Sequence, residues 1–279
     1  MVFMDSQNPF SLPELSKTVQ HYALKFSQDF SVATNLFQHH NQAFEEEYQN
    51  HLKEISPIFP ILELKADFDL FNWEKESGRK QNYTPKELAE ARARMQVLNN
   101  YRSSHKIELA LLNGVHQSII AVALETSGLS EKLRKQHEVG KKLAVVETSA
   151  RLSPCLTFVG SSNYLESMMV PYGKKARRAL GEKQVQSLVS SEAVEESVRN
   201  AQRLFGVDYV LAETSAAPRD EVPKSKRKPE VYLCALMGGN TKIMTLDTTH
   251  QVIDTPFREE FNCRVRESMY FALKKMYGG

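Results

Sequence analysis

The sequence predicts an α/β fold, in which a layered α/β domain follows a helical N-terminal region. Two patterns predict it. In the first part of the chain, apolar residues recur every three or four positions, as on one face of a helix. After residue 140, short apolar runs typical of buried strands alternate with helical patterns. The chain has 279 residues, of which 41% are hydrophobic, so it can form one large or two modest domains.

Charge and cysteine content exclude several classes of protein. The 36 Lys+Arg and 34 Asp+Glu residues leave a net charge of only +2, without the overall basic field of a nucleic-acid-binding domain. Three widely spaced cysteines exclude a disulfide scaffold and a CxxC zinc site. The charge is uneven, at −4 over residues 1–128 and +6 over residues 129–279. This asymmetry is consistent with two units that have different surfaces.

Start and stop signals divide the N-terminal region into helices. Ser11–Glu14 has the Ser-x-x-Glu spacing of a capping box, and Pro57 and Pro60 end the helix that it opens. The apolar stripe of this helix comprises Leu15, Val19, Tyr22, Phe26, Phe30, Ala33, Phe37, Phe44 and Tyr48. A second capping box, Thr84–Glu87, opens another helical pattern, which we expect to break at Asn99-Asn100 and to resume from Ile107 to Leu124.

Two features of this region suggest metal binding but are better explained otherwise. Residues 67–73 alternate acids with aromatics without the glycine and glutamate of an EF-hand, so we expect the aromatics to pack on a neighbouring helix. His21, His39, His40 and His51 lack the spacing that places two ligands on one helix face. We therefore expect solvated or half-buried histidines and no metal site.

The second region alternates strands and helices. Strands are expected at residues 143–146, 207–212 and 231–236, and helices at 192–204 and 261–276. The loop from Pro218 to Pro229 contains the basic run Lys224–Lys228. A nuclear address or an anion site could use this run, but a solvated loop is the favoured interpretation. It has no stacking aromatics, so nucleic-acid binding is not favoured.

Five short motifs occur in an order that resembles a known family. They are Val146–Leu152, Gly160–Ser162, Tyr172–Arg177, Val189–Glu192 and Asp208–Ala212. Their order and spacing are similar to those of the C-terminal domain of the competence/damage-inducible CinA proteins, which include nicotinamide mononucleotide (NMN) deamidases. The resemblance implies a CinA C-terminal-like α/β domain over residues 115–279, preceded by a helical N-terminal region over residues 1–114.

The resemblance also implies three candidate catalytic residues. Thr148 stands where the family has its serine nucleophile, Tyr172 is the family's tyrosine, and Arg177 replaces the family's lysine. A hydroxyl needs a nearby base to become a nucleophile. Arginine stays protonated and cannot be that base, although it can clamp an anion.

The implied substrate-binding residues are Glu147, Ser149, Gly160, Ser161, Ser162 and Arg258. Here too the chain departs from the family, because Arg151-Leu152 replaces a glycine pair and Arg258 or Arg264 would have to substitute for a displaced arginine. Each retained residue also has a structural explanation. Glu147 can cap or pair with a neighbour, and Tyr172 can be a half-buried strand residue.

These departures favour a divergent CinA-like protein that has lost NMN deamidase activity and acts as a nucleotide-binding or protein-interaction and assembly module. The alternative is an active amidohydrolase on NMN or a related small amide. Thr148, or Ser149 after a one-residue shift, would then be its nucleophile, Tyr172 the proton acceptor and Arg177 a clamp.

The resemblance implies a cytoplasmic homo-oligomer that needs no cofactor, and the N-terminal helices are candidates for a partner or dimer surface. Neither a secretory signal nor a run of about 20 apolar residues is visible, so we expect no membrane contact.

Overall fold

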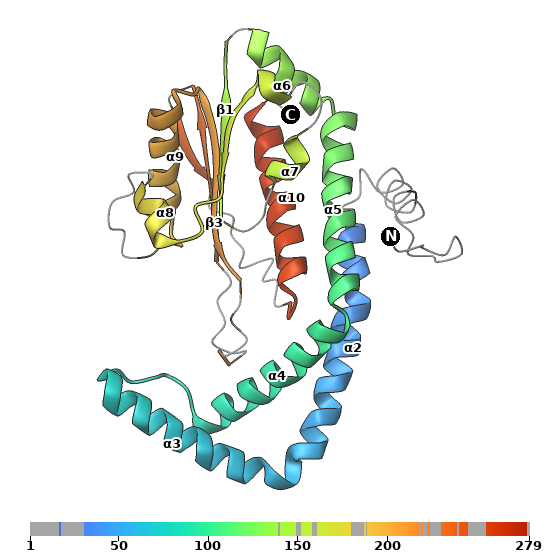
Figure 1. Cartoon of the computed structure of the whole chain (residues 1–279), viewed down its shortest axis with the longest axis vertical. Coiled ribbons are helices and arrows are strands. Elements are labelled where there is room, and N and C mark those ends of the chain that lie inside the picture. Colours follow the sequence, from blue (N-terminus) through green and yellow to red (C-terminus); the bar gives the residue numbers. More distant parts are fainter. Residues whose placement is uncertain are drawn as a thin grey trace, which may run out of the picture.

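The structure of the chain, a computed structural model, combines a long helical arm with a layered α/β body (Figure 1). It describes residues 17, 31–138, 140–148, 152–157, 161–179, 187, 189–217, 219, 222–223, 230–238, 240–244 and 255–277. The predicted capping box Ser11–Glu14, the apolar positions up to Phe30 and the basic run Lys224–Lys228 therefore lie outside the described residues.

The helical arm contains α2 (Ser31–Ile55), α3 (Phe59–Ser77) and α4 (Pro85–Ser104). The prediction that Pro57 and Pro60 end the first helix is confirmed, since α2 stops at Ile55. The sequence did not predict α3, which begins directly after a short 3-10 turn at residues 56–58. Pro60 lies in the first turn of α3, where its missing N–H costs no hydrogen bond.

The second capping box is confirmed. The Thr84 hydroxyl accepts a hydrogen bond from the Glu87 N–H at 3.2 Å, and the Glu87 carboxylate accepts one from the Thr84 N–H at 2.9 Å. The expected break at Asn99-Asn100 is wrong, because α4 continues to Ser104 and α5 (Lys106–Thr126) begins after His105. Burial of Leu98 and Tyr101, on either side of the asparagines, holds the helix together there.

Replacing Thr84 by alanine should lower the free energy of unfolding by about 1 kcal/mol, because the Glu87 N–H at the start of α4 loses its acceptor, the Thr84 hydroxyl. Urea denaturation followed by circular dichroism measures this change. The control is Lys86→Ala, which alters an exposed side chain in the same turn. Equal stabilities of the two variants would contradict a stabilising role for the cap.

The expectation that the aromatics of residues 67–73 pack on a neighbouring helix is wrong for two of them. Phe68 and Phe71 are 66% and 64% exposed. The face of α3 that packs against α4 is the opposite one, which carries Ala66 and Leu70. The spacing of the acids and aromatics could not reveal this, because both faces of α3 are apolar.

The body is built on a five-stranded sheet with the order β2-β1-β3-β4-β5. Its strands are β1 (Leu143–Glu147), β2 (Leu165–Met169), β3 (Tyr209–Ala216), β4 (Glu230–Met237) and β5 (Asn240–Met244). The first three are parallel to one another, and β4 is antiparallel to both β3 and β5. The sequence predicted β1, β3 and β4 but not the edge strands. β2 alternates half-buried and exposed residues, so it has no continuous apolar run.

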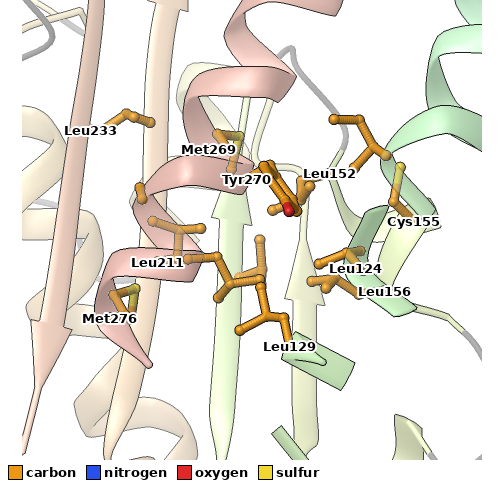
Figure 2. Packing of buried hydrophobic residues seen from close by; sticks show 14 of the residues in the cluster. Leu124, Leu129, Leu152, Cys155, Leu156, Leu211, Leu233, Met269, Tyr270 and Met276 are labelled. Carbon is orange, nitrogen blue, oxygen red and sulfur yellow. The ribbon is translucent and has the colours of Figure 1, made fainter. Parts of the chain in front are cut away.

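Helices cover both faces of this sheet, which confirms the α/β fold class (Figure 1). One face is covered by α9 (Ser191–Phe205), whose predicted start is confirmed because the Ser190 hydroxyl accepts from the Ala193 N–H at 3.1 Å. On the other face lie α10 (Arg258–Met276), α5 and α6 (Leu129–Glu138). Figure 2 shows the core on this side, a single cluster that includes Leu211 and Met269 as well as Leu124 and Leu156.

Helix α5 joins the arm to the body. It passes without a break through residues 114 and 115, and it contacts both α2 and α10. The division at this point into two domains therefore stays a prediction. By length and composition, α5 is also the one helix of the described chain that could cross a membrane, with 39% of its most apolar window buried. Its packing against α6, α7 (Ser153–Leu156) and α10 is that of a core helix.

Candidate functional site

The candidate residues gather where the parallel strands end. In α/β sheets, ligands bind outside the carboxyl ends of the strands. β1 ends at Glu147, which lies opposite Glu213 of the neighbouring strand β3. Thr148 directly follows β1, and Tyr172 follows the end of β2 by three residues. The sheet topology thus brings Glu147, Thr148 and Tyr172 to one edge.

Glu147 is a buried carboxylate that holds the start of α7. It accepts hydrogen bonds from the Leu152 N–H at 2.5 Å, the Ser153 N–H at 3.1 Å and the Ser153 hydroxyl at 2.5 Å. The pKa of Glu147 is raised, mainly because burial disfavours the charged carboxylate. The hydrogen bonds from Ser153 and Leu152 oppose this shift, and the charge of the nearby Glu213 adds to it. These contacts agree with a capping role for Glu147, which was the structural alternative to substrate binding in the sequence analysis.

Sequence reasoning missed Glu213, which is the closest partner of Thr148. Its buried carboxylate accepts a hydrogen bond from the Thr148 N–H at 2.9 Å. Each of the two carboxylate oxygens is also 3.4 Å from the oxygen of the Thr148 hydroxyl. A signal was present. The letters Glu-Thr-Ser-Ala occur twice, at residues 147–150 and 213–216, each time after an apolar strand. In the sheet the first residues of these two repeats are paired in register.

The Thr148 hydroxyl is a link between two strands. It donates to Glu213 and accepts a hydrogen bond from the Ser215 N–H at 3.2 Å. A carboxylate beside a hydroxyl can remove its proton. Among the described residues, Glu213 is therefore the potential base that lies beside the predicted nucleophile Thr148. The family pattern would instead require Tyr172 as the partner.

Tyr172 is paired with Arg258 instead. The Arg258 guanidinium, on the first residue of α10, donates to the Tyr172 hydroxyl at 3.0 Å. Tyr172 is 67% exposed, so the structural alternative, a half-buried strand residue, is wrong. It lies three residues beyond the end of the edge strand β2. The third candidate, Arg177, lies on the short helix α8 (Lys174–Ala179) and is buried.

The other predicted binding residues divide into two groups. Ser149 and Gly160, together with Arg151 of the replaced glycine pair, lie outside the described residues. Ser161 and Ser162 form a 3-10 turn that leads into β2, in which the Ser161 carbonyl accepts from the Tyr164 N–H at 3.1 Å.

Of the two arginines proposed as substitutes, Arg258 is the one at the strand edge. Arg264 is bound to Glu260, one turn earlier on α10, at 2.9 Å. The buried Glu260 carboxylate also accepts from the Thr255 hydroxyl at 2.6 Å. This places Arg264 in a structural network and leaves Arg258 with the exposed tyrosine.

A second polar network lies between α5 and α10. Arg266 is buried and donates to His116 Nδ1 at 2.8 Å and to Asn113 Oδ1 at 2.9 Å. Arginine can only donate, so His116 is neutral, and its Nε2–H donates to Glu267 at 3.0 Å. Burial, and then Arg266, lower the pKa of His116 to about 3, whereas burial raises the pKa of Glu267 to about 7.

The described residues offer no cluster of three or more histidine, cysteine, aspartate or glutamate side chains suited to a metal ion. Within that part of the chain, the candidate site therefore consists of hydroxyls, carboxylates and guanidinium groups. Such groups can transfer protons and bind anions.

Comparisons with known proteins identify similar structures but no similar sequences. No family model and no curated protein matches the chain. Among solved structures, it is similar to competence/damage-inducible proteins from several bacteria. For the Klebsiella pneumoniae protein, the identity is 18%, the match covers 53% of this chain and 93% of that one, and the TM-score is 0.44.

For the Enterobacter asburiae protein, the identity is again 18%, the coverages are 56% and 96%, and the TM-score is 0.45. For the Agrobacterium tumefaciens protein, the identity is 18%, the match covers 57% of this chain and 96% of that one, and the TM-score is 0.39. These structures carry the family name to which the sequence motifs pointed, and they match about half of this chain. At these values the comparison carries no inference about activity or substrate.

Proposed function

We propose that this chain is a CinA-like protein that binds a small nucleotide-like anion at the carboxyl edge of its sheet and does not hydrolyse it. The observation that carries the proposal is the pairing of the two catalytic candidates with other groups. The Thr148 hydroxyl is engaged by Glu213 and Ser215, and the Tyr172 hydroxyl by Arg258.

This pairing weakens the chemistry that the motifs would otherwise imply. A threonine attacks an amide only when a base removes its proton as the bond forms. Tyr172 is held by a guanidinium, and Arg177 cannot accept a proton. The negative charge that develops on the carbonyl oxygen of the attacked amide would also need hydrogen-bond donors in fixed positions. Loss of one such donor typically costs about 2.7–4 kcal/mol of transition-state stabilisation.

Ligand binding is supported by the exposed pair Tyr172–Arg258. A phenol ring can stack on a planar base, and a guanidinium can bind a phosphate with two hydrogen bonds. Both side chains are exposed at the edge where ligands of α/β sheets bind. The choice of a nicotinamide nucleotide as the probe comes from the motif resemblance.

One observation favours an active amidohydrolase as the second candidate. The Thr148 Oγ1 lies 3.4 Å from both oxygens of Glu213, which could act as the missing base. Such contacts are often long before substrate binds. In this mechanism Glu213 would take the proton of Thr148 as the hydroxyl attacks the carboxamide carbon, and would pass it to the amide nitrogen as the C–N bond breaks and ammonia leaves. Water would then hydrolyse the acyl ester on Thr148, giving the carboxylic acid and restoring the hydroxyl.

A thermal-shift titration with NMN and nicotinic acid mononucleotide, followed by an ammonia-release assay, tests both candidates. At about 100 times its dissociation constant, a ligand stabilises the fold by roughly 2.7 kcal/mol. We expect a shift without ammonia release, and loss of the shift in Arg258→Ala. The control Arg199→Ala alters an exposed arginine on α9 and should leave the shift unchanged.

Two results would contradict the proposal. Absence of a shift with either nucleotide would remove the ligand and leave the protein-interaction role. Ammonia release at an ordinary enzymatic rate, abolished by Thr148→Ala and by Glu213→Gln, would establish the amidohydrolase instead. Circular dichroism of both variants shows whether a loss of rate comes from a loss of fold.

A further inference from the structure

Helix α3 carries a row of large apolar side chains that the described residues leave uncovered. Ile61, Leu64, Phe68 and Phe71, which we name the α3 stripe, are 65%, 71%, 66% and 64% exposed. Ile58, in the turn before α3, extends the row and is 48% exposed. Their spacing of three or four residues places them on one face of the helix.

This face lies opposite the one that packs against α4. The inner face, which includes Leu62, Ala66 and Leu70, contacts Leu88 and Ala89 of α4. α3 is thus apolar on two opposite sides, a pattern typical of a helix that is buried on both. At the far end of the arm, away from the sheet, the structure covers only the inner side (Figure 1).

We propose that the α3 stripe is the contact through which two copies of this chain form a dimer, with the two α3 helices antiparallel. The stripe reads the same in both directions, because its spacings are three, four and three residues. A two-fold axis level with Ala66 therefore places Ile61 against the partner's Phe71 and Leu64 against the partner's Phe68. Each aliphatic side chain of the stripe then meets an aromatic one, and each contact occurs twice, as a two-fold symmetric interface requires.

The size of the stripe agrees with this occupant. A whole aromatic side chain presents about 150–250 Å² of surface, so the five exposed side chains offer roughly 500 Å² per copy. Two copies would bury on the order of 1,000 Å², near the lower limit of a specific interface. A contiguous apolar patch of this size is in the range of the largest patches on monomeric proteins, which are often functional.

Charges beside the stripe help to distinguish a second copy from a different partner. Near the two-fold axis, Asp67 comes close to the partner's Asp67, so the contact gains nothing from charge attraction. Added salt screens this repulsion and should leave the dimer intact or tighten it. A foreign basic helix attracted by Asp67, Glu63 and Glu74 would instead be released by salt.

Sedimentation velocity on the full chain, at several concentrations and two salt concentrations, tests the proposal. We expect the unsubstituted protein to be a dimer, and Leu64→Glu and Phe68→Glu each to weaken the dimer by at least about 100-fold, because a carboxylate is buried in an apolar contact. The control is Leu204→Glu on α9, where the leucine is 57% exposed, and it should leave the dimer unchanged.

A cross-linking experiment tests the antiparallel register. An oxidised mixture of Leu64→Cys and Phe68→Cys should form a mixed disulfide dimer, and neither variant should cross-link alone. The three native cysteines are buried and should not interfere. Self-linking of either variant would overturn the antiparallel arrangement.

Two outcomes would overturn the dimer itself. The first is a monomer at every concentration, which would mean that residues 1–30 of the same chain or another protein cover the stripe. The second is a dimer that tolerates both glutamate substitutions. Because all substituted positions are exposed, circular dichroism should show the same fold for every variant.

Discussion

Glu147→Ala should lower the free energy of unfolding by about 3–5 kcal/mol, although the residue stands among the predicted substrate-binding groups. The side chain is fully buried and accepts hydrogen bonds from two N–H groups and one hydroxyl, all from Leu152 and Ser153. Alanine leaves these donors buried without a partner, and each such group costs about 1–3 kcal/mol. Urea denaturation measures the change.

Glu147→Gln should have an intermediate effect, because its amide retains one acceptor oxygen but turns a donor toward the other N–H group. The matched control is Glu166→Ala on β2. That glutamate is exposed, and the Lys142 ammonium is 3.9 Å away, so the change should stay within about 0.5 kcal/mol. If Glu147→Ala matched this control, the carboxylate would be free for a ligand and the structural assignment would be wrong.

Arg266→Met is the second substitution with a large expected effect, a loss of about 3–5 kcal/mol in the free energy of unfolding. Arg266 is buried between α5 and α10 and donates to His116 Nδ1 and Asn113 Oδ1. Methionine fills much of the same volume but cannot donate, so both acceptors lose this bond in the buried contact between the two helices. Chemical denaturation at pH 7 measures the loss.

The double variant His116→Leu/Arg266→Met separates this network from simple packing. Removing both partners of a buried polar pair is often far less costly than removing one, so we expect the double variant to recover part of the lost stability. Lys274→Met, at an exposed position of the same helix, should be close to neutral. Additive losses in the double variant would show that the contact between His116 and Arg266 contributes nothing.

The sequence determined the elements whose signals are local. The Thr84–Glu87 box and Ser190 each bond N–H groups within three residues, so the starts of α4 and α9 follow from neighbouring side chains alone. Continuous apolar runs identified β1, β3 and β4, which lie inside the sheet. The edge strands β2 and β5 were not predicted, and in β2 the reason is visible, because half-buried and exposed residues alternate and give no such run.

The candidate site was predicted in part. Thr148 and Tyr172, which the motifs identified as candidates, both follow the carboxyl ends of strands, and Arg258 is bonded to Tyr172 there. Which side chain each hydroxyl bonds to could not be predicted. Thr148 meets Glu213, 65 residues later, only because β1 and β3 are parallel and in that register.

The same distinction applies to α3. Its amino acids favour a helix with two apolar faces, and the residue pattern treats both faces alike. Only the packing of α4 decided which face is buried, and it left Phe68 and Phe71 exposed on the other. Local hydrogen bonds and burial patterns are encoded in neighbouring residues. Contacts between distant segments depend on strand register and helix packing, which form only when the whole chain folds.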